Sequence, residues 1–140
     1  MLSSIERSGS DGSVSNVVSR SCLVTDDSAP VRRIARRLLT DMGFVVDEAE
    51  NGKIALEKCQ IQMPDVVLLD WNMPIMNGLE FLVELRQTDE GKVPIVIFCT
   101  TETDVNHIQK AIESGADEYL MKPFDKDSLG AKLSAVPPRK

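Results

Sequence analysis

Polar residues that could do chemistry follow four of the short apolar runs in this 140-residue chain. The paired Asp26 and Asp27 follow the first such run, and Asp70 follows Val-Val-Leu-Leu. Thr100 and Lys122 come at the ends of two later runs. A short apolar run bounded by turn signals predicts a strand buried on both faces, as in a parallel sheet. Because the carboxyl ends of parallel strands share one edge, we expect these side chains to meet where open α/β sheets bind ligands.

These residue types together indicate phosphoryl chemistry. Three neighbouring carboxylates repel one another and need a cation or a proton at neutral pH. An acidic cluster made only of oxygen ligands suits Mg²⁺ better than zinc or copper. A lysine supplies a point charge for a phosphoryl group, and a threonine hydroxyl can donate to one. An aspartate can act as the nucleophile and form an acyl phosphate. These residues together therefore point to Mg²⁺-assisted phosphorylation of Asp70. Glu48 and Glu50 at the end of the second predicted strand show that a carboxylate at a strand end can also be without such a role.

The rest of the sequence predicts elements that would position this cluster. Apolar runs predict five strands, and periodic segments between and after them predict five helices. The strands are expected at 21–25, 44–49, 66–70, 93–99 and 117–121, and the helices at 28–42, 53–60, 77–88, 104–114 and 125–136. Such alternation indicates one parallel sheet with helices on both faces, joined by right-handed crossovers.

Helical periodicity also predicts which faces are buried. The first helix repeats apolar residues at Val31, Ile34, Ala35, Leu38, Leu39 and Met42. The third helix takes its spacing from Leu79, Leu82, Val83 and Arg86, and the last from Leu129, Leu133 and Val136. The outer face of the first helix carries Arg32, Arg33, Arg36 and Arg37. That face is either simply solvated or a docking surface for an acidic partner.

Composition excludes several classes of protein. Hydrophobic residues make up 42% and charged residues 27%, as in ordinary globular domains. A net charge of −6 argues against nucleic acid as a partner. No apolar run approaches the roughly 18 residues of a membrane span, and the first residues lack the apolar core of a signal peptide. We therefore expect a cytoplasmic protein without membrane attachment.

The sulfur and imidazole groups do not suggest a metal site. Cys22, Cys59 and Cys99 are odd in number and widely spaced, which favours buried thiols in a reducing compartment. His107 is the only histidine and has no ligand at zinc-site spacing, so we expect it on a helix surface.

The chain divides into one domain and two short ends. Residues 1–19 are rich in serine and glycine without periodicity, which predicts a disordered tail. The domain is expected over 20–136, and 137–140 form a short C-terminal tail. A monomer is the expected state.

Over residues 20–136 the chain resembles the receiver domain of two-component response regulators, especially the stand-alone CheY-like type. The resemblance rests on Asp26-Asp27, Asp70-Trp71-Asn72-Met73-Pro74 with Met76-Asn77-Gly78, Thr100, and Tyr119 with Lys122-Pro123. The intervals fit as well: 43 positions from Asp27 to Asp70, 30 to Thr100 and 22 more to Lys122. The resemblance implies a flavodoxin-like five-stranded sheet in the order 2-1-3-4-5.

The resemblance also implies roles for the residues of the cluster. Asp70 matches the phosphoacceptor, and Lys122 matches the lysine that pairs with the phosphoryl group. Asp27 and Asp70 match side-chain ligands of Mg²⁺, with Asp26 acting mostly through water. Asn72 matches the position that binds the ion through its backbone carbonyl.

Further positions match the family's switch and its tuning of hydrolysis. Thr100 and Tyr119 match the pair whose movement remodels the face of the fourth helix, fifth strand and fifth helix. Asn72 and Glu102 match positions that set the lifetime of the acyl phosphate, and their identities imply a short one. Thr101 stands where the family usually has a very small residue, so it is expected to narrow access for small phosphodonors.

The implied function is that of a single-domain response regulator. It would take a phosphoryl group from a histidine kinase or a histidine phosphotransfer protein and act by contact with an output protein that the sequence does not identify. No DNA-binding or enzymatic output region is expected. Two alternatives remain from the residues alone. A haloacid dehalogenase-type phosphohydrolase would want an aspartate where Asn72 stands, and an FMN binder would want a Ser/Thr/Gly loop in place of Asp26-Asp27.

Overall fold

The computed structural model of the chain describes residues 20–101 and 105–136. Its strands are β1 (Ser21–Thr25), β2 (Val45–Ala49), β3 (Val66–Asp70), β4 (Ile95–Thr100) and β5 (Glu118–Met121). Its helices are α1 (Ala29–Asp41), α2 (Gly52–Ile61), α3 (Gly78–Leu85), α4 (Val105–Glu113) and α5 (Lys126–Ala135), with one 3₁₀ turn at Glu90–Lys92. The predicted tails and Glu102 lie outside the described residues.

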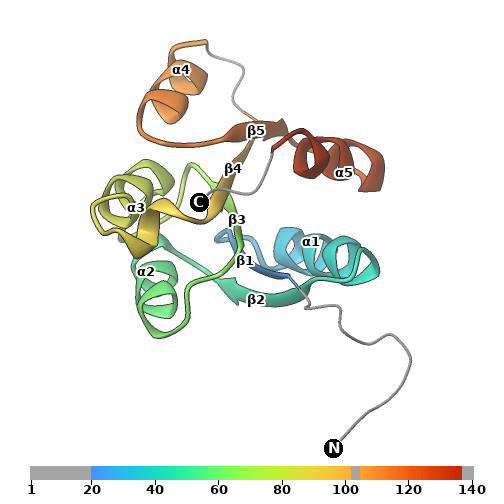
Figure 1. Ribbon diagram of the computed structural model, residues 1–140. Coiled ribbons are helices and arrows are strands. Elements are labelled where there is room, and N and C mark those ends of the chain that lie inside the picture. The colour runs from blue at the N-terminus through green and yellow to red at the C-terminus, as the bar shows by residue number, and fades with distance from the viewer. Residues whose placement is uncertain (1–19, 102–104, 137–140) are drawn as a thin grey trace, which may run out of the picture.

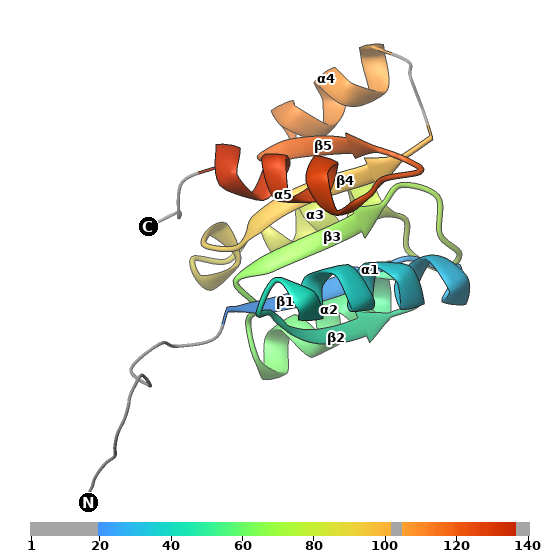
Figure 2. The same cartoon turned by 90° about the vertical axis from the view of Figure 1, so that its right-hand side faces the viewer.

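The five strands form one parallel sheet in the order β2-β1-β3-β4-β5, as expected (Figure 2). Helices α1 and α5 cover one face, and α2, α3 and α4 cover the other (Figure 1). Each face encloses its own apolar cluster. All five residues of β3 are buried, because this central strand is covered on both sides. The fold is therefore the flavodoxin-like architecture that the sequence predicted.

Local sequence signals fix where the helices begin. The Ser28 side chain accepts from the backbone N–H of Val31 at 3.3 Å at the start of α1. Asn77 and Glu80 form a reciprocal capping box at the start of α3, with both bonds at 2.9 Å. Such caps satisfy donors that the first helical turn leaves open. Gly43, with φ +95°, follows α1 in the left-handed conformation that favours glycine.

The buried face of two helices differs from the prediction. Ile34 of α1 belongs to the periodic apolar set, yet 56% of it is exposed. In α3 the buried residues are Gly78, Phe81, Leu82 and Leu85, whereas Val83 is 44% exposed. Apolar periodicity alone is wrong here because both helices carry more apolar residues than the sheet can cover. The predicted buried positions of α5, Leu129 and Leu133, are confirmed.

Arg86, predicted as a spacing position of α3, instead ties three segments together. Its guanidinium donates to the carbonyl oxygens of Gly91, Pro94 and Gly115 at 2.8–3.0 Å. It also pairs with the Asp117 carboxylate at 3.2 Å, and both side chains are only 10% exposed. The contact joins the end of α3 to the segments that lead into β4 and β5.

The three cysteines are buried free thiols, as expected. Burial raises the pKa of Cys22 and of Cys59 to about 12, and it also raises the pKa of Cys99. Within the described residues, no helix has the length and apolar character needed to cross a membrane.

Candidate functional site

The carboxyl edge of the sheet brings together charged side chains from three separate strands. Asp26 follows β1, Asp70 ends β3 and Lys122 follows β5. The Lys122 Nζ lies 2.7 Å from an Asp26 oxygen and 3.2 Å from Asp70 Oδ1. Asp26 is 3% exposed and Asp70 is 9% exposed. Side chains as far as 96 positions apart in sequence therefore share one nearly buried site.

Backbone contacts hold Asp26 in place. Its N–H donates to the carbonyl of Ala49 at 3.0 Å, which anchors the residue to β2. Its Oδ1 accepts from the N–H of Ser28 at 2.9 Å, and its carbonyl accepts from Arg32 at 2.6 Å. The carboxylate is thus fixed by the same turn that begins α1.

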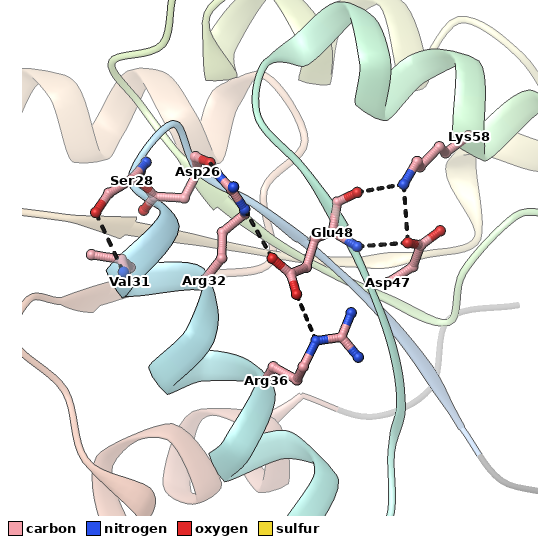
Figure 3. A network of polar contacts seen from close by, with 8 residues as sticks. All are labelled: Asp26, Ser28, Val31, Arg32, Arg36, Asp47, Glu48 and Lys58. Carbon is pink, nitrogen blue, oxygen red and sulfur yellow. Dashed lines mark hydrogen bonds and ion pairs between the residues drawn. The ribbon is translucent and has the colours of Figure 1, made fainter.

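Arg32 and Arg36 are held by an acidic residue of β2 (Figure 3). Arg32 Nε donates to one oxygen of Glu48 at 2.9 Å, and Arg36 Nε donates to the other at 2.6 Å. Both arginines belong to the face that the sequence predicts to be either simply solvated or a docking surface. Both bonds link α1 to β2. The Arg32 side chain is largely buried, whereas Arg33, Arg36 and Arg37 are exposed.

The loop after β3 presents Asp70. Asp70 Oδ1 accepts from the N–H of Trp71 at 2.9 Å as well as from Lys122. Its other oxygen, Oδ2, accepts no hydrogen bond from the residues that the structure describes. The loop closes where the N–H of Gly78 donates to the Trp71 carbonyl at 2.9 Å. A Cβ at Gly78 would overlap the Asp70 carbonyl, so the close approach requires glycine.

The acidic residues can hold a cation. One carboxylate oxygen each from Asp26, Asp27 and Asp70 lies within 4.8 Å of the others, and Asp27 is exposed to solvent. All three ligand atoms are oxygens, the donor set that Mg²⁺ prefers. The residues present therefore fit the ion that the sequence predicted.

The electrostatics of the site also favour a bound cation. Burial raises the pKa of Asp70, and the Asp26 charge raises it further, while Lys122 opposes both. Burial alone would lower the pKa of Lys122, but its bonds and charge attraction to Asp26 and Asp70 outweigh this, and its pKa is raised. One cation faces two buried carboxylates and a third exposed one. The surplus of negative charge favours a second cation at this edge.

The other predicted site residues lie around the cluster. Asn72 is exposed in the loop after Asp70, and Thr101 is exposed just after β4. Thr100 is buried at the end of β4, and Tyr119 is half-buried on β5. Glu102 falls outside the described residues.

Thr100 and Tyr119 line one small hollow of about 10 Å³ under α4, together with the rings of Trp71, Phe98 and His107. Trp71 packs 5.0 Å from the ring of Phe98 and edge-on to the ring of His107 at 4.8 Å. His107 was predicted as a plain helix-surface residue, and that prediction is wrong because α4 turns its imidazole toward Trp71. No local sequence signal could reveal this contact between distant segments.

The response regulator receiver domain model matches residues 22–134. The chain belongs to the response regulator receiver domain family. Receiver domains are phosphorylation switches, so the chain takes part in phosphorylation-based signalling. The receiver family binds Mg²⁺ at an acidic pocket, and the three aspartates form a pocket of this kind.

Individual receivers resemble the chain over nearly their full length. The chemotaxis protein CheY of Halobacterium salinarum is 36% identical over 119 residues, covering 85% of this chain and 98% of that protein. The chemotaxis protein CheY1 of Helicobacter pylori is 39% identical over 116 residues, covering 81% and 94%.

Solved structures agree. That of the Vibrio cholerae chemotaxis protein CheY4 has a TM-score of 0.81 at 34% identity, over 86% of this chain and all of that one. The CheX-CheY-BeF3-Mg²⁺ complex of Borrelia burgdorferi has a TM-score of 0.78 at 25% identity, covering 83% of this chain and 87% of that one.

Proposed function

We propose that the chain is a single-domain response regulator, a cytoplasmic monomer that accepts a phosphoryl group on Asp70 in a Mg²⁺-dependent reaction. The donor would be a histidine kinase or a histidine phosphotransfer protein, and the output would be contact with another protein. The observation that carries the proposal is that Asp26, Asp70 and Lys122 meet at one edge of the sheet. The Lys122 Nζ lies 2.7 Å from a carboxylate oxygen of Asp26 and 3.2 Å from one of Asp70.

The proposed transfer is a direct displacement at phosphorus. Asp70 Oδ2 attacks the phosphorus of a phosphohistidine, so an O–P bond forms while the P–N bond breaks. The electron pair of the broken bond stays on the imidazole nitrogen of the donor. Lys122 sits beside the attacking carboxylate and would pair with a phosphoryl oxygen after transfer. Catalysis would come mainly from positioning and charge neutralisation.

Asp27 and Asp70 would hold Mg²⁺ through their side chains, with the Asn72 backbone carbonyl as a further ligand and Asp26 acting mostly through water. The bound ion would neutralise negative charge between the carboxylates and the incoming phosphoryl group. The similar Borrelia burgdorferi structure is a complex of CheX and CheY with BeF3 and Mg²⁺, which supports a Mg²⁺ site in this chain.

Thr100 and Tyr119 would transmit the signal. The Thr100 hydroxyl would move toward the phosphoryl group, and the Tyr119 ring would turn into the hollow that the two residues already line. This movement would remodel the face made by α4, β5 and α5. Physically, a new charge biases an element with two arrangements.

The lifetime of the phosphoryl group is part of the proposal. Asn72 and Glu102 would permit rapid hydrolysis, so the acyl phosphate should be short-lived. A phosphorylated Asp70 that survives for many hours in Mg²⁺ would contradict this. Thr101 would restrict small donors such as acetyl phosphate more than a protein donor.

The fluorescence of Trp71, the single tryptophan, provides the test because this residue adjoins Asp70 and packs on the rings under α4. Mg²⁺ is titrated first, and beryllofluoride or acetyl phosphate is then added. We expect a Mg²⁺-dependent change followed by a second change that Asp70→Asn abolishes.

Each other outcome has a distinct meaning. A response to beryllofluoride but not to acetyl phosphate would support restricted donor access at Thr101. No response to any of the three would overturn the proposal. Turnover of a generic phosphatase substrate would favour the phosphohydrolase alternative, and a yellow purified protein would favour the FMN binder.

A further inference from the structure

The outer side of α3 carries an apolar hollow of about 340 Å³. We call it the α3 groove, and its lining residues are Ile75, Met76, Leu79, Glu80, Val83 and Glu84. The groove exists because α3 buries Phe81, Leu82 and Leu85 against the sheet. The remaining apolar residues of the helix are left on its outer side.

Ile75 has an unusual backbone conformation at one end of this groove. Its φ is +71°, and it is the only non-glycine residue with positive φ among the described residues. A β-branched residue is strained in this conformation, which asparagine or glycine adopts readily. Burial of the side chain does not offset the strain, because Ile75 is 78% exposed. The local structure gives no reason for isoleucine here, so an external contact is the better explanation.

The groove combines an apolar row with acidic neighbours. Ile75, Leu79 and Val83 follow one another at intervals of four, and Glu80 and Glu84 repeat the same interval beside them. Both glutamates are exposed. Residues four apart lie on one side of a helix, so within α3 the pair Leu79 and Val83 runs alongside the two glutamates. Ile75 lines the same groove from the loop before the helix.

We propose that the α3 groove docks an amphipathic helix of a partner protein, with apolar residues spaced by three and four and with lysine or arginine on its flanks. Such a helix fills an apolar groove with one face and pairs its charges with the rim. The acidic rim and the net charge of −6 disfavour an anionic membrane or nucleic acid at this surface. The groove lies outside the α4, β5 and α5 face of the proposed switch, and the docking does not require a phosphoryl group on Asp70.

Two designed helical peptides test the proposal on the isotope-labelled full chain. One has leucines spaced by three and four with flanking lysines, and the other replaces the lysines with glutamates. We expect the lysine peptide to shift amide resonances over 75–85, and the glutamate peptide to bind at least tenfold more weakly.

Variants then locate the contact. Ile75→Asn and Glu84→Lys should each weaken the lysine peptide by roughly tenfold, the usual scale for a well-placed interface residue. Ile34→Asn and Asp41→Lys on α1 are matched controls, because α1 lies on the opposite face of the sheet (Figure 1). The controls should leave the affinity unchanged. The Trp71 response to Mg²⁺ should persist in all four variants and shows that each is folded.

Several results would overturn the proposal. The first is that the two peptides bind equally well, and the second is that Ile75→Asn leaves the affinity for the lysine peptide unchanged. The third is that the peptide shifts amide resonances mainly around Asp26 and Asp27. Concentration-dependent self-association that Glu84→Lys abolishes would instead assign the groove to a second copy of this chain. The Asp70→Asn variant should bind the lysine peptide as tightly as the wild-type chain. Peptide binding therefore tests the α3 groove separately from the proposed phosphorylation of Asp70.

Discussion

Each end of the sheet contains a buried cation that faces a carboxylate, but the two sites differ in charge balance. At the end where β4 and β5 begin, Arg86 pairs with the carboxylate of Asp117 and also donates to three backbone carbonyls. At the carboxyl end, Lys122 meets two buried carboxylates, Asp26 and Asp70.

The difference separates a structural site from a reactive one. Asp117 also accepts from the N–H of Val96 at 2.8 Å, so the Arg86 site joins three segments with matched charges. The Lys122 site keeps a surplus of negative charge, and the pKa of Asp70 is raised as a result of burial and of that surplus. A balanced buried pair fixes the fold, whereas an unbalanced one is ready to accept a cation.

The largest expected effect comes from removing the balanced cation. Arg86→Ala leaves Asp117 as an uncompensated buried charge and several carbonyls without their donor. We expect the free energy of unfolding to fall by about 3–5 kcal/mol in urea titrations. The exposed Arg33→Ala is the control and should change it by less than about 0.5 kcal/mol. A loss below about 1 kcal/mol for Arg86→Ala would remove the distinction between the two ends.

Removing a carboxylate should change the free energy of unfolding in opposite directions at the two ends of the sheet. Without Mg²⁺ at pH 7, Asp70→Asn should raise the free energy of unfolding by roughly 1 kcal/mol, a common size for one substitution. Asp117→Asn should lower it, because Arg86 loses its counter-charge.

The pH dependence of the Asp70 effect follows from its raised pKa. The folded state binds a proton at Asp70 more readily than the unfolded state, so ionisation of this group destabilises the fold at high pH. The advantage of Asp70→Asn should therefore shrink as pH falls through the folded pKa toward the ordinary range. Mg²⁺ should also shrink it by stabilising the wild-type chain. An advantage that stays constant with pH and Mg²⁺ would contradict the account.

The smallest effect is expected at an exposed pair. Glu48→Gln should lower the free energy of unfolding by about 0.5 kcal/mol, and less at high salt. Its bond from Arg36 is the largest of the causes that lower the pKa of Glu48, and the bond from Arg32 adds to it. Stability from Glu48 is therefore present above its unfolded pKa and lost as pH falls through the folded one, the reverse of Asp70. If the effects of Glu48→Gln and Asp70→Asn on the free energy of unfolding changed with pH in the same direction, the causes given for the two pKa shifts would be refuted.

The sequence predicted most of the fold because its signals are local. The apolar runs that form β1, β3 and β4 and the cap residues Ser28 and Asn77 each act within a few positions. The convergence of Asp26 and Asp70 also follows, since parallel strands place their carboxyl ends at one edge.

What the sequence could not reveal depends on contacts between distant segments. Arg86 reaches Gly115, 29 positions away in the sequence, and the His107 ring of α4 contacts the ring of Trp71 after β3. Neither contact leaves a periodic signal. The exposure of Ile34 was missed for a related reason, because periodicity marks an apolar side of a helix without showing how far the sheet covers it.

The buried cysteines have a consequence for chemical modification. Thiolate is the form that reacts with oxidants and alkylating reagents, and the pKa of Cys22 and of Cys59 is raised to about 12 by burial. The folded chain should therefore resist peroxide and maleimide at neutral pH. A cysteine introduced on the surface would react alone, so a dye could be attached at one chosen position without first removing the native thiols.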